Sequence, residues 1–249
     1  MRLKHLFAIL GYFFLLGLGA GNRLAYPQEI RAAAEWNLFT TLPPTPIQQS
    51  ITHNLATPFN EIILPILPDM TLAHVNKTYA LPSSYVPSNL TQITGASSAG
   101  AQFMRADILP YFYQLIGAAQ EAGYNLLALS AYRSYATQVA TFNYWVSAYG
   151  LSAALAGSAR PGHSEHQLGT AVDLALLQNR EFAYFTLHPA AGWVAKNAYK
   201  FGFVVSYQQG KQAITGYIWE PWHIRWVGVG LAAKLYKQNL SLEEYLSGL

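Results

Sequence analysis

An aspartate sits inside an apolar, strand-like segment, TAVDLAL at residues 170–176. A buried carboxylate is costly unless a cation or a metal ion compensates it, so the fold around Asp173 must supply a partner. His166 precedes it in the same motif, and Gly169 gives the chain a place to turn between the two. The sequence therefore predicts that the turn at Gly169 and the buried strand with Asp173 both contribute to one polar site.

A second polar motif, EPWH, contributes Glu220 and His223. The imidazoles of His166 and His223 and the carboxylate of Asp173 form a three-ligand set for Zn²⁺, with a fourth position left for water. A metal held in this way lowers the pKa of its water from about 15.7 towards about 7. Glu220 is then the candidate general base. The sequence therefore predicts one zinc ion per chain.

Each of these residues also has an ordinary structural explanation, such as a loop histidine, a capping aspartate or a glutamate on a helix face. The spacings H-x6-D and E-x-x-H are both common. Their coincidence in a chain with only 11% charged residues favours the metal site. His163, which lies in the same motif, is expected to be a loop residue near the site.

Composition excludes several classes of protein. The chain has no cysteine, which rules out a disulfide scaffold, a thiolate metal site and a cysteine nucleophile. Its fifteen basic residues are scattered and the net charge is +3, so no nucleic-acid partner is expected. Hydrophobic residues make up 52% of the sequence, which argues against disorder over most of its length.

The N-terminus is typical of an exported protein. The basic stretch MRLKH is followed by an apolar run from Leu6 to Gly21, the order found in a secretory signal. The run is shorter than the roughly 20 residues that span a bilayer comfortably. Residues 1–21 are therefore predicted to be a signal peptide or a short membrane anchor, the only part in contact with a membrane. The protein is expected in the cell envelope.

The rest of the chain divides into a Pro-rich connecting region at 22–70 and a mixed domain at 71–249. Apolar periodicity predicts helices over 99–123, which Pro110 should kink or divide, and over 135–150, 193–199, 230–239 and from Ser241, where Glu244 completes a capping box. Short apolar runs predict strands at 125–130, 170–176, 201–207 and 222–227. Without regular βαβ alternation, the expected fold class is α+β.

Three segments together resemble a known family: SAYRSYATQ (130–138), PGHSEHQLGTAVDL (161–174) and EPWHIRWVG (220–228). In order and spacing they are similar to the signature motifs of the VanY-type D-alanyl-D-alanine carboxypeptidases, zinc peptidases of the M15 family that act on bacterial peptidoglycan. The segment 75–90 resembles that family's N-terminal part. The resemblance implies a small mixed domain with a central antiparallel sheet flanked by helices, as in the hedgehog signalling domain.

The resemblance implies the same zinc ligands and the same base as the argument from chemistry. It also implies that Arg133 polarises the scissile carbonyl and stabilises the oxyanion, a task suited to a guanidinium that stays charged. Gln138 and Ser164 are implied as substrate-binding residues. Many members carry Arg before the Tyr of the segment matched here by GFVVSY, whereas this chain has Ser206. Substrate preference is therefore left open.

The expected function is removal of the C-terminal D-alanine from peptidoglycan stem peptides, carried out by a monomer with one zinc ion. The alternatives are an L,D-carboxypeptidase or an endopeptidase acting on the same peptides, and a non-catalytic module that binds wall peptide. The presence of Glu220 and Arg133 argues against the last of these. A serine-type D,D-peptidase is excluded because the chain has neither an S-x-x-K nor a K-T-G motif.

Overall fold

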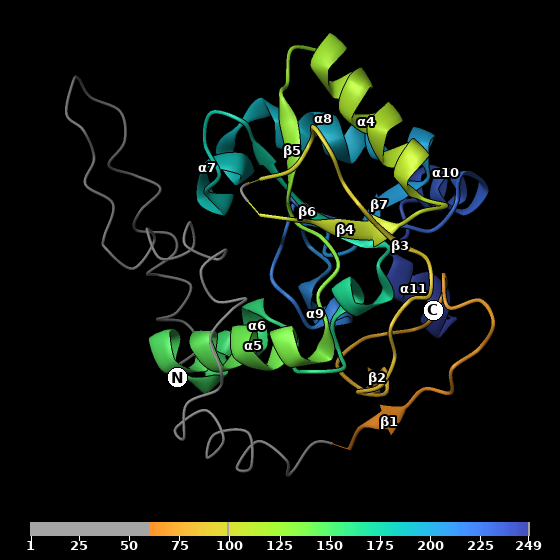
Figure 1. The fold of residues 1–249 in the computed structure, drawn as a ribbon, viewed down its shortest axis with the longest axis vertical. Helices are drawn as coiled ribbons and strands as arrows, with labels where there is room; N and C mark the ends of the chain where they lie inside the picture. The colour runs from red at the N-terminus through yellow and green to blue at the C-terminus, as the bar shows by residue number, and fades with distance from the viewer. Residues whose placement is uncertain (1–59, 99, 249) are drawn as a thin grey trace.

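The computed structural model describes residues 60–98 and 100–248 (Figure 1). The predicted signal or anchor at 1–21 and most of the Pro-rich region at 22–70 lie outside these residues. Among the helices of the described part, none is long and apolar enough to cross a lipid bilayer.

A four-stranded antiparallel sheet lies at the centre, with strand order β5-β6-β8-β7. Its members are β5 (Leu126–Ser130), β6 (Ala171–Leu176), β7 (Phe203–Val205) and β8 (His223–Trp226). All four coincide with predicted strands. β6 and β8 are the inner strands, and every residue of β6 is buried. The predicted α+β fold with a central antiparallel sheet is confirmed.

Strand register brings the two sequence motifs together. Asp173 on β6 lies opposite His223 on β8 and is also paired with Ser130 on β5. Directly opposite residues project from the same face of a sheet. Pairing of β6 with β8 therefore places the carboxylate of the first motif beside the imidazole of the second.

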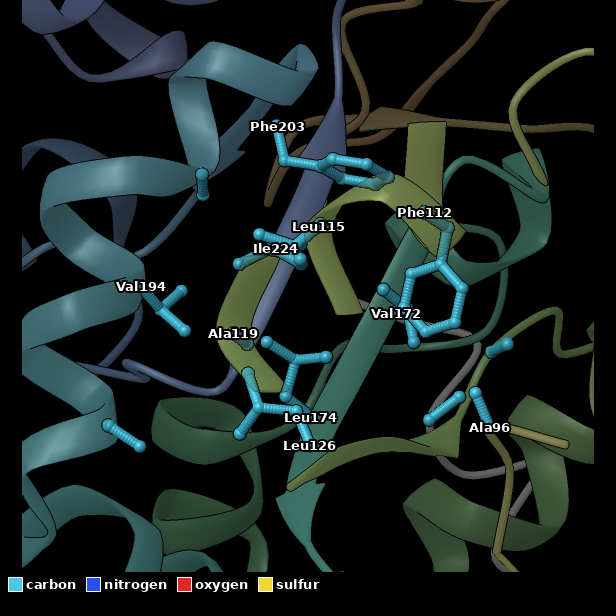
Figure 2. Close-up of a cluster of buried hydrophobic side chains, with 14 of the residues drawn as sticks. Ala96, Phe112, Leu115, Ala119, Leu126, Val172, Leu174, Val194, Phe203 and Ile224 are labelled. Atoms are coloured by element: carbon cyan, nitrogen blue, oxygen red, sulfur yellow. The ribbon is translucent and has the colours of Figure 1, made fainter. Parts of the chain in front are cut away.

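The other face of the sheet carries the hydrophobic core. Helices α4 (Leu109–Glu121) and α8 (Pro189–Asn197) pack there, and Figure 2 shows their side chains meeting Val172, Leu174 and Ile224. Side chains alternate between the faces of a strand. The residues between and beside these three, including Asp173, must therefore face away from the core.

The remaining helical segments lie around the sheet and at its ends (Figure 1). They are α5 (Tyr135–Tyr149), α6 (Leu151–Gly157), η2 (Glu165–Leu168), α7 (Phe182–Leu187), η3 (Ala198–Phe201), α9 (Gln212–Thr215), α10 (Val229–Gln238) and α11 (Leu242–Ser247). The predicted helices at 135–150 and 230–239 match α5 and α10. The capping box of α11 is present, with the Ser241 and Glu244 side chains bonded reciprocally to backbone N–H groups.

The helix predicted over 99–123 is wrong in its first half. Residues 103–105 form strand β4 (Phe103–Arg105), which pairs with β3 (Leu90–Gln92). The helix begins only at Leu109, with Pro110 in its first turn. Proline is tolerated there because the first N–H groups of a helix have no intrahelical acceptor. Pro110 thus begins α4 instead of kinking it.

A segment N-terminal to the sheet packs across the first motif. Strand β1 (Ile62–Ile63) pairs in parallel with β2 (Tyr79–Ala80), and Leu81 N–H donates to the carbonyl of Gly162 at 2.8 Å. Gly162 has φ +84°, and a Cβ there would lie 2.9 Å from the Leu81 carbonyl oxygen. Only glycine permits this close approach.

Candidate metal centre and active site

The structure brings the three predicted zinc ligands to one buried point. One donor atom from each of His166, Asp173 and His223 lies within 4.8 Å of the other two. His166 comes from η2, which ends at Gly169 in the left-handed conformation, as the predicted turn requires. His166 Nε2 lies 3.1 Å from Asp173 Oδ2, and His223 Nδ1 lies 2.8 Å from Asp173 Oδ1.

Each histidine has its other ring nitrogen bonded away from this point. His166 Nδ1 donates to the carbonyl of Ala131 at 2.7 Å, and His223 Nε2 donates to Glu165 Oε2 at 2.9 Å. These bonds leave Nε2 of His166 and Nδ1 of His223 directed at Asp173. Two imidazole nitrogens and a carboxylate, with an open position, are a donor set that suits catalytic Zn²⁺.

Without a metal, the charges of this group compensate one another. Burial alone would raise the pKa of Asp173, but His166 and His223 hold it well below its ordinary value. Burial alone would lower the pKa of His223, but its hydrogen bonds to Asp173 and Glu165 raise it to about 10. Burial lowers the pKa of His166. Binding of a metal ion at Nδ1 of His223 therefore competes with protonation of that ring.

Glu220 lies in the same cavity as the three ligands. The loop before β8 holds it there, since its N–H donates to the Tyr207 carbonyl at 3.0 Å and its carbonyl accepts from the His223 N–H at 3.1 Å. Burial raises the pKa of Glu220 to about 8. A dication held by the neighbouring ligands would favour the ionised carboxylate. The placement suits a general base, and that role stays a prediction.

Arg133 also lines the cavity, and it is almost fully buried. One of its terminal nitrogens donates to Gln138 Oε1 and the other to Ser130 Oγ, each at 2.8 Å. The second of these nitrogens lies 3.6 Å from Asp173 Oδ2. The guanidinium is thus held in place beside the ligand group.

Gln138 and Ser164 differ in their relation to the cavity. Ser164 lines it. Gln138 is fully buried, its Oε1 accepts from Arg133, and its Nε2 donates to the Ala159 carbonyl at 2.6 Å. Gln138 is not one of the described residues that line the cavity. Through its bond to Arg133 it orients that guanidinium, and its predicted contact with substrate stays a prediction.

The cavity has a volume of about 280 Å³, and six aromatic side chains contribute to its wall. These are Trp145, Tyr149, Phe182, Tyr207, Tyr217 and Trp222. The Phe182 and Trp222 rings stack at 4.5 Å, and Tyr207 stacks on His223 at 4.9 Å. Apolar walls around a few convergent polar groups are typical of a small-ligand or peptide site.

The sequence profile of the VanY family, described as D-alanyl-D-alanine carboxypeptidase, matches residues 101–229. This stretch is just over half of the chain and includes all three candidate ligands and Glu220. The chain belongs to the VanY D-alanyl-D-alanine carboxypeptidase family. It is therefore an enzyme of the carboxypeptidase class, as predicted.

Two bacterial proteins are similar to this chain over most of its described part. The protein YodJ of Bacillus subtilis is 39% identical over 188 residues, which cover 72% of this chain and 67% of that protein. A D-alanyl-D-alanine carboxypeptidase of Enterococcus faecalis is 35% identical over 188 residues, covering 72% and 66%. The chain thus spans about two thirds of the length of these relatives.

Solved structures of similar proteins share the fold. The LdcB LD-carboxypeptidase has a TM-score of 0.63 at 38% identity, covering 70% of this chain and 84% of that one. VanYB in complex with D-alanine-D-alanine has a TM-score of 0.62 at 33% identity, covering 72% and 98%. A VanY mutant in complex with Zn(II) also has a TM-score of 0.62. Together with the donor set here, this confirms zinc as the cofactor.

One polar residue of this VanY-family site was missed by the sequence interpretation. Glu165 stands between Ser164 and His166, and it bonds to His223, Ser206 and Arg225. The available signal was that Glu165 is an acidic residue within a motif, in a chain that has few charged residues. Nothing in the sequence indicates that Arg225 lies beside it, because that contact depends on how η2 packs against β8.

The structure also locates the departure at Ser206. Its hydroxyl donates to Glu165 Oε2 at 2.6 Å, and the residue is 3% exposed. Ser206 is not one of the described residues that line this cavity. In this chain, the residue at the departure from the family pattern therefore contacts Glu165 and does not line the cavity.

Proposed function

We propose that this chain is a zinc-dependent carboxypeptidase that removes the C-terminal D-alanine from peptidoglycan stem peptides. The observation that carries the proposal is the convergence of His166, Asp173 and His223 in the same cavity as Glu220 and Arg133. Relatives named as D-alanyl-D-alanine carboxypeptidases, and a structural neighbour bound to D-alanine-D-alanine, support this choice of substrate.

His166 Nε2, the Asp173 carboxylate and His223 Nδ1 would hold the zinc ion. When bound, zinc supplies Lewis acidity, which makes a water molecule more acidic and polarises the scissile carbonyl. Glu220 accepts the proton of the attacking water and delivers it to the amine of the departing D-alanine. The C–N bond breaks as that nitrogen is protonated, so the leaving group departs as a neutral amine.

Arg133 stabilises the negative charge that develops on the carbonyl oxygen during attack. A donor that is already oriented needs no reorganisation at that moment and is most effective in a site from which water is excluded. The hydrogen bonds from Arg133 to Gln138 and Ser130 hold it in this orientation.

The bond that is cut has two candidates. Similarity to VanYB in complex with D-alanine-D-alanine favours the D,D bond of a pentapeptide stem. Two structures named as L,D-carboxypeptidases, LdcB at 38% identity and the pneumococcal DacB at 36%, favour the L,D bond of a tetrapeptide as the second candidate. Both substrates end in D-alanine, so the same site chemistry serves either one.

The test is incubation of zinc-loaded protein with purified tetrapeptide and pentapeptide stems and with free D-Ala-D-Ala, with products identified by mass. We expect release of D-alanine from the pentapeptide and slow attack on the dipeptide. Release from the tetrapeptide alone would establish the L,D activity, and cleavage inside the stem an endopeptidase. If zinc-loaded protein binds stems without cleaving any of them, the proposal is wrong and the binding-module alternative holds.

We also propose that the protein acts in the cell envelope as a monomer. Support for the location comes from the basic and then apolar order of residues 1–21, and from the fact that stem peptides of the wall lie outside the cytoplasmic membrane. Cell fractionation and N-terminal sequencing test this: a mature chain beginning near Asn22 indicates cleavage, and a full-length chain in the membrane fraction indicates an anchor. Light scattering, which gives the molar mass in solution, tests whether the protein is a monomer.

A further inference from the structure

His223 lies between two carboxylates, one on each side of its ring. Nδ1 is 2.8 Å from Asp173 Oδ1, and Nε2 is 2.9 Å from Glu165 Oε2. Asp173 belongs to the ligand group, whereas Glu165 does not. The nitrogen that faces the metal position is therefore Nδ1, while the hydrogen on Nε2 is directed to Glu165.

Glu165 is itself held from three directions. Oε1 accepts from a terminal nitrogen of Arg225 at 2.8 Å, and Oε2 accepts from Ser206 Oγ at 2.6 Å as well as from His223. The other terminal nitrogen of Arg225 donates to the carbonyls of Thr71 and Ala73 at 2.9 and 2.8 Å. The carboxylate therefore has little freedom to rotate.

The arrangement follows from strand alternation and register. His223 and Arg225 stand two residues apart on β8, so they project from the same face of the sheet. Ser206 directly follows β7, the strand that pairs with β8. Glu165 enters from η2, which also carries His166. Three elements thus converge on one carboxylate that touches a zinc ligand and lies off the metal position.

We propose that Glu165 is a positioning residue for the metal site: it keeps the His223 ring turned so that Nδ1, with its lone pair, faces the zinc. Arg225 and Ser206 serve by fixing the two oxygens of Glu165. The proposal rests on the zinc site of the proposed function. It assigns a task to residues outside the ligand set, the base and the oxyanion donor.

The competing explanation is that Glu165 and Arg225 form a purely structural buried ion pair. Both residues are almost inaccessible to solvent, with exposures of 4% and 0%, and breaking such a pair destabilises any fold. The two explanations differ in one respect. A structural pair affects unfolding alone, whereas a positioning residue also changes the zinc affinity of the folded protein.

Two substitutions of similar size separate the hydrogen bond from the charge. Glu165→Gln keeps an oxygen that can accept from His223 Nε2, and Glu165→Leu keeps the bulk without an acceptor; both leave Arg225 without its anion. Zinc affinity is measured by competition with a chromophoric chelator, in the absence of substrate. We expect the Leu variant to bind zinc about 10- to 100-fold more weakly than the unmodified protein, with the Gln variant in between.

The chain supplies a matched control. Glu61 also accepts from a histidine and an arginine, His163 and Arg160, at 3.0 and 3.3 Å, away from the metal ligands. The same two substitutions at Glu61 should leave zinc affinity within about twofold. In the zinc-loaded protein, NMR should show a slowly exchanging His223 Nε2 proton, which is lost in Glu165→Leu and retained in both Glu61 variants.

Equal zinc affinity in folded Glu165→Leu and the unmodified protein would overturn the proposal. If Glu165→Leu does not fold, Ser206→Ala decides, because it keeps every charge and removes one bond to Glu165. It should weaken zinc binding by roughly two- to fivefold, and unchanged affinity would overturn the proposal. A protein that binds zinc as expected but cleaves no stem peptide would refute the proposed function and leave this inference intact.

Discussion

The molecule contains two sets of arginine, glutamate and histidine that look alike and lie in different surroundings. In the outer set, Glu61 accepts from Arg160 and His163. In the inner set, Glu165 accepts from Arg225 and His223. His163 and Glu165 belong to the same sequence motif, so membership of that motif does not by itself distinguish the two sets.

The two sets differ in the burial of their glutamate and in what the second ring nitrogen of their histidine contacts. The side chain of Glu61 is 44% exposed and that of Glu165 only 5%. Burial opposes ionisation of Glu165, but Arg225 and then His223 hold its pKa at about 2. The charge of Glu61 can instead be solvated by water.

The second nitrogen of each histidine shows the consequence. His163 Nδ1 bonds to the backbone carbonyl of Asn76 at 2.7 Å, so this ring ties the segment before β2 to the motif loop. His223 Nδ1 faces Asp173, a proposed metal ligand. Similar residues therefore form a structural tie in one place and a ligand support in the other.

The largest expected difference comes from removing each histidine. His223→Ala deletes a ligand, so zinc content should fall from about one ion per chain to near zero and turnover should be lost. His163→Ala should keep its zinc and instead lose roughly 1–3 kcal/mol of unfolding free energy, because buried hydrogen-bonding groups lose their partner. Metal analysis and thermal unfolding measure the two effects. Zinc loss in both variants would show that His163 also supports metal binding, contrary to the proposed difference between the sets.

Neutralising a glutamate should give the second-largest difference, because turnover should fall when the glutamate lies in the cavity and stay normal when it lies in the outer set. Glu220→Gln preserves shape but accepts no proton, so turnover should fall by about 10²–10⁴ with zinc content unchanged. Glu61→Gln should keep normal turnover. Steady-state kinetics on a stem peptide, with metal content measured in parallel, provides the comparison. Near-normal turnover in Glu220→Gln would mean that another group is the base.

The pH dependence of zinc binding should reflect the inner set alone. The pKa of His223 is raised to about 10, so below that pH the metal-free protein carries a proton that zinc must displace. Zinc affinity should therefore rise with pH, by up to about tenfold per unit between pH 6 and 8. Competition titrations at several pH values measure this slope. Glu61→Gln should show the same slope, and a pH-independent affinity would contradict the assignment.

The smallest effect is expected from the outer ion pair itself. Glu61→Ala removes a half-exposed partner of Arg160 and His163, and such pairs contribute about 0–1 kcal/mol. Urea unfolding should show a loss in that range, reduced further at high salt because salt screens exposed charges. A loss of several kcal/mol would show that the outer set supports the fold as strongly as a buried pair.

Much of the site could be predicted from sequence because its determinants are local. The turn at Gly169 and the alternation of β6 place Asp173 on the face opposite Val172 and Leu174, and both follow from short-range geometry. The zinc ligands follow from the chemistry of the side chains in two short motifs. The strands of the central sheet are short apolar runs, and these were recognisable without any contact information.

The rest was decided by tertiary structure. Gln138 turns inward to Arg133, Ser206 turns to Glu165, and Arg225 reaches the same carboxylate from another strand. Residues 103–105 form a strand because β3 is available to pair with them, although their own periodicity favours a helix. The contacts of Ser206 and Arg225 with Glu165 join segments 41 and 60 residues apart in the chain, and all of these contacts depend on register and packing. Sequence determined which groups could bind zinc, and packing determined which groups hold them in place.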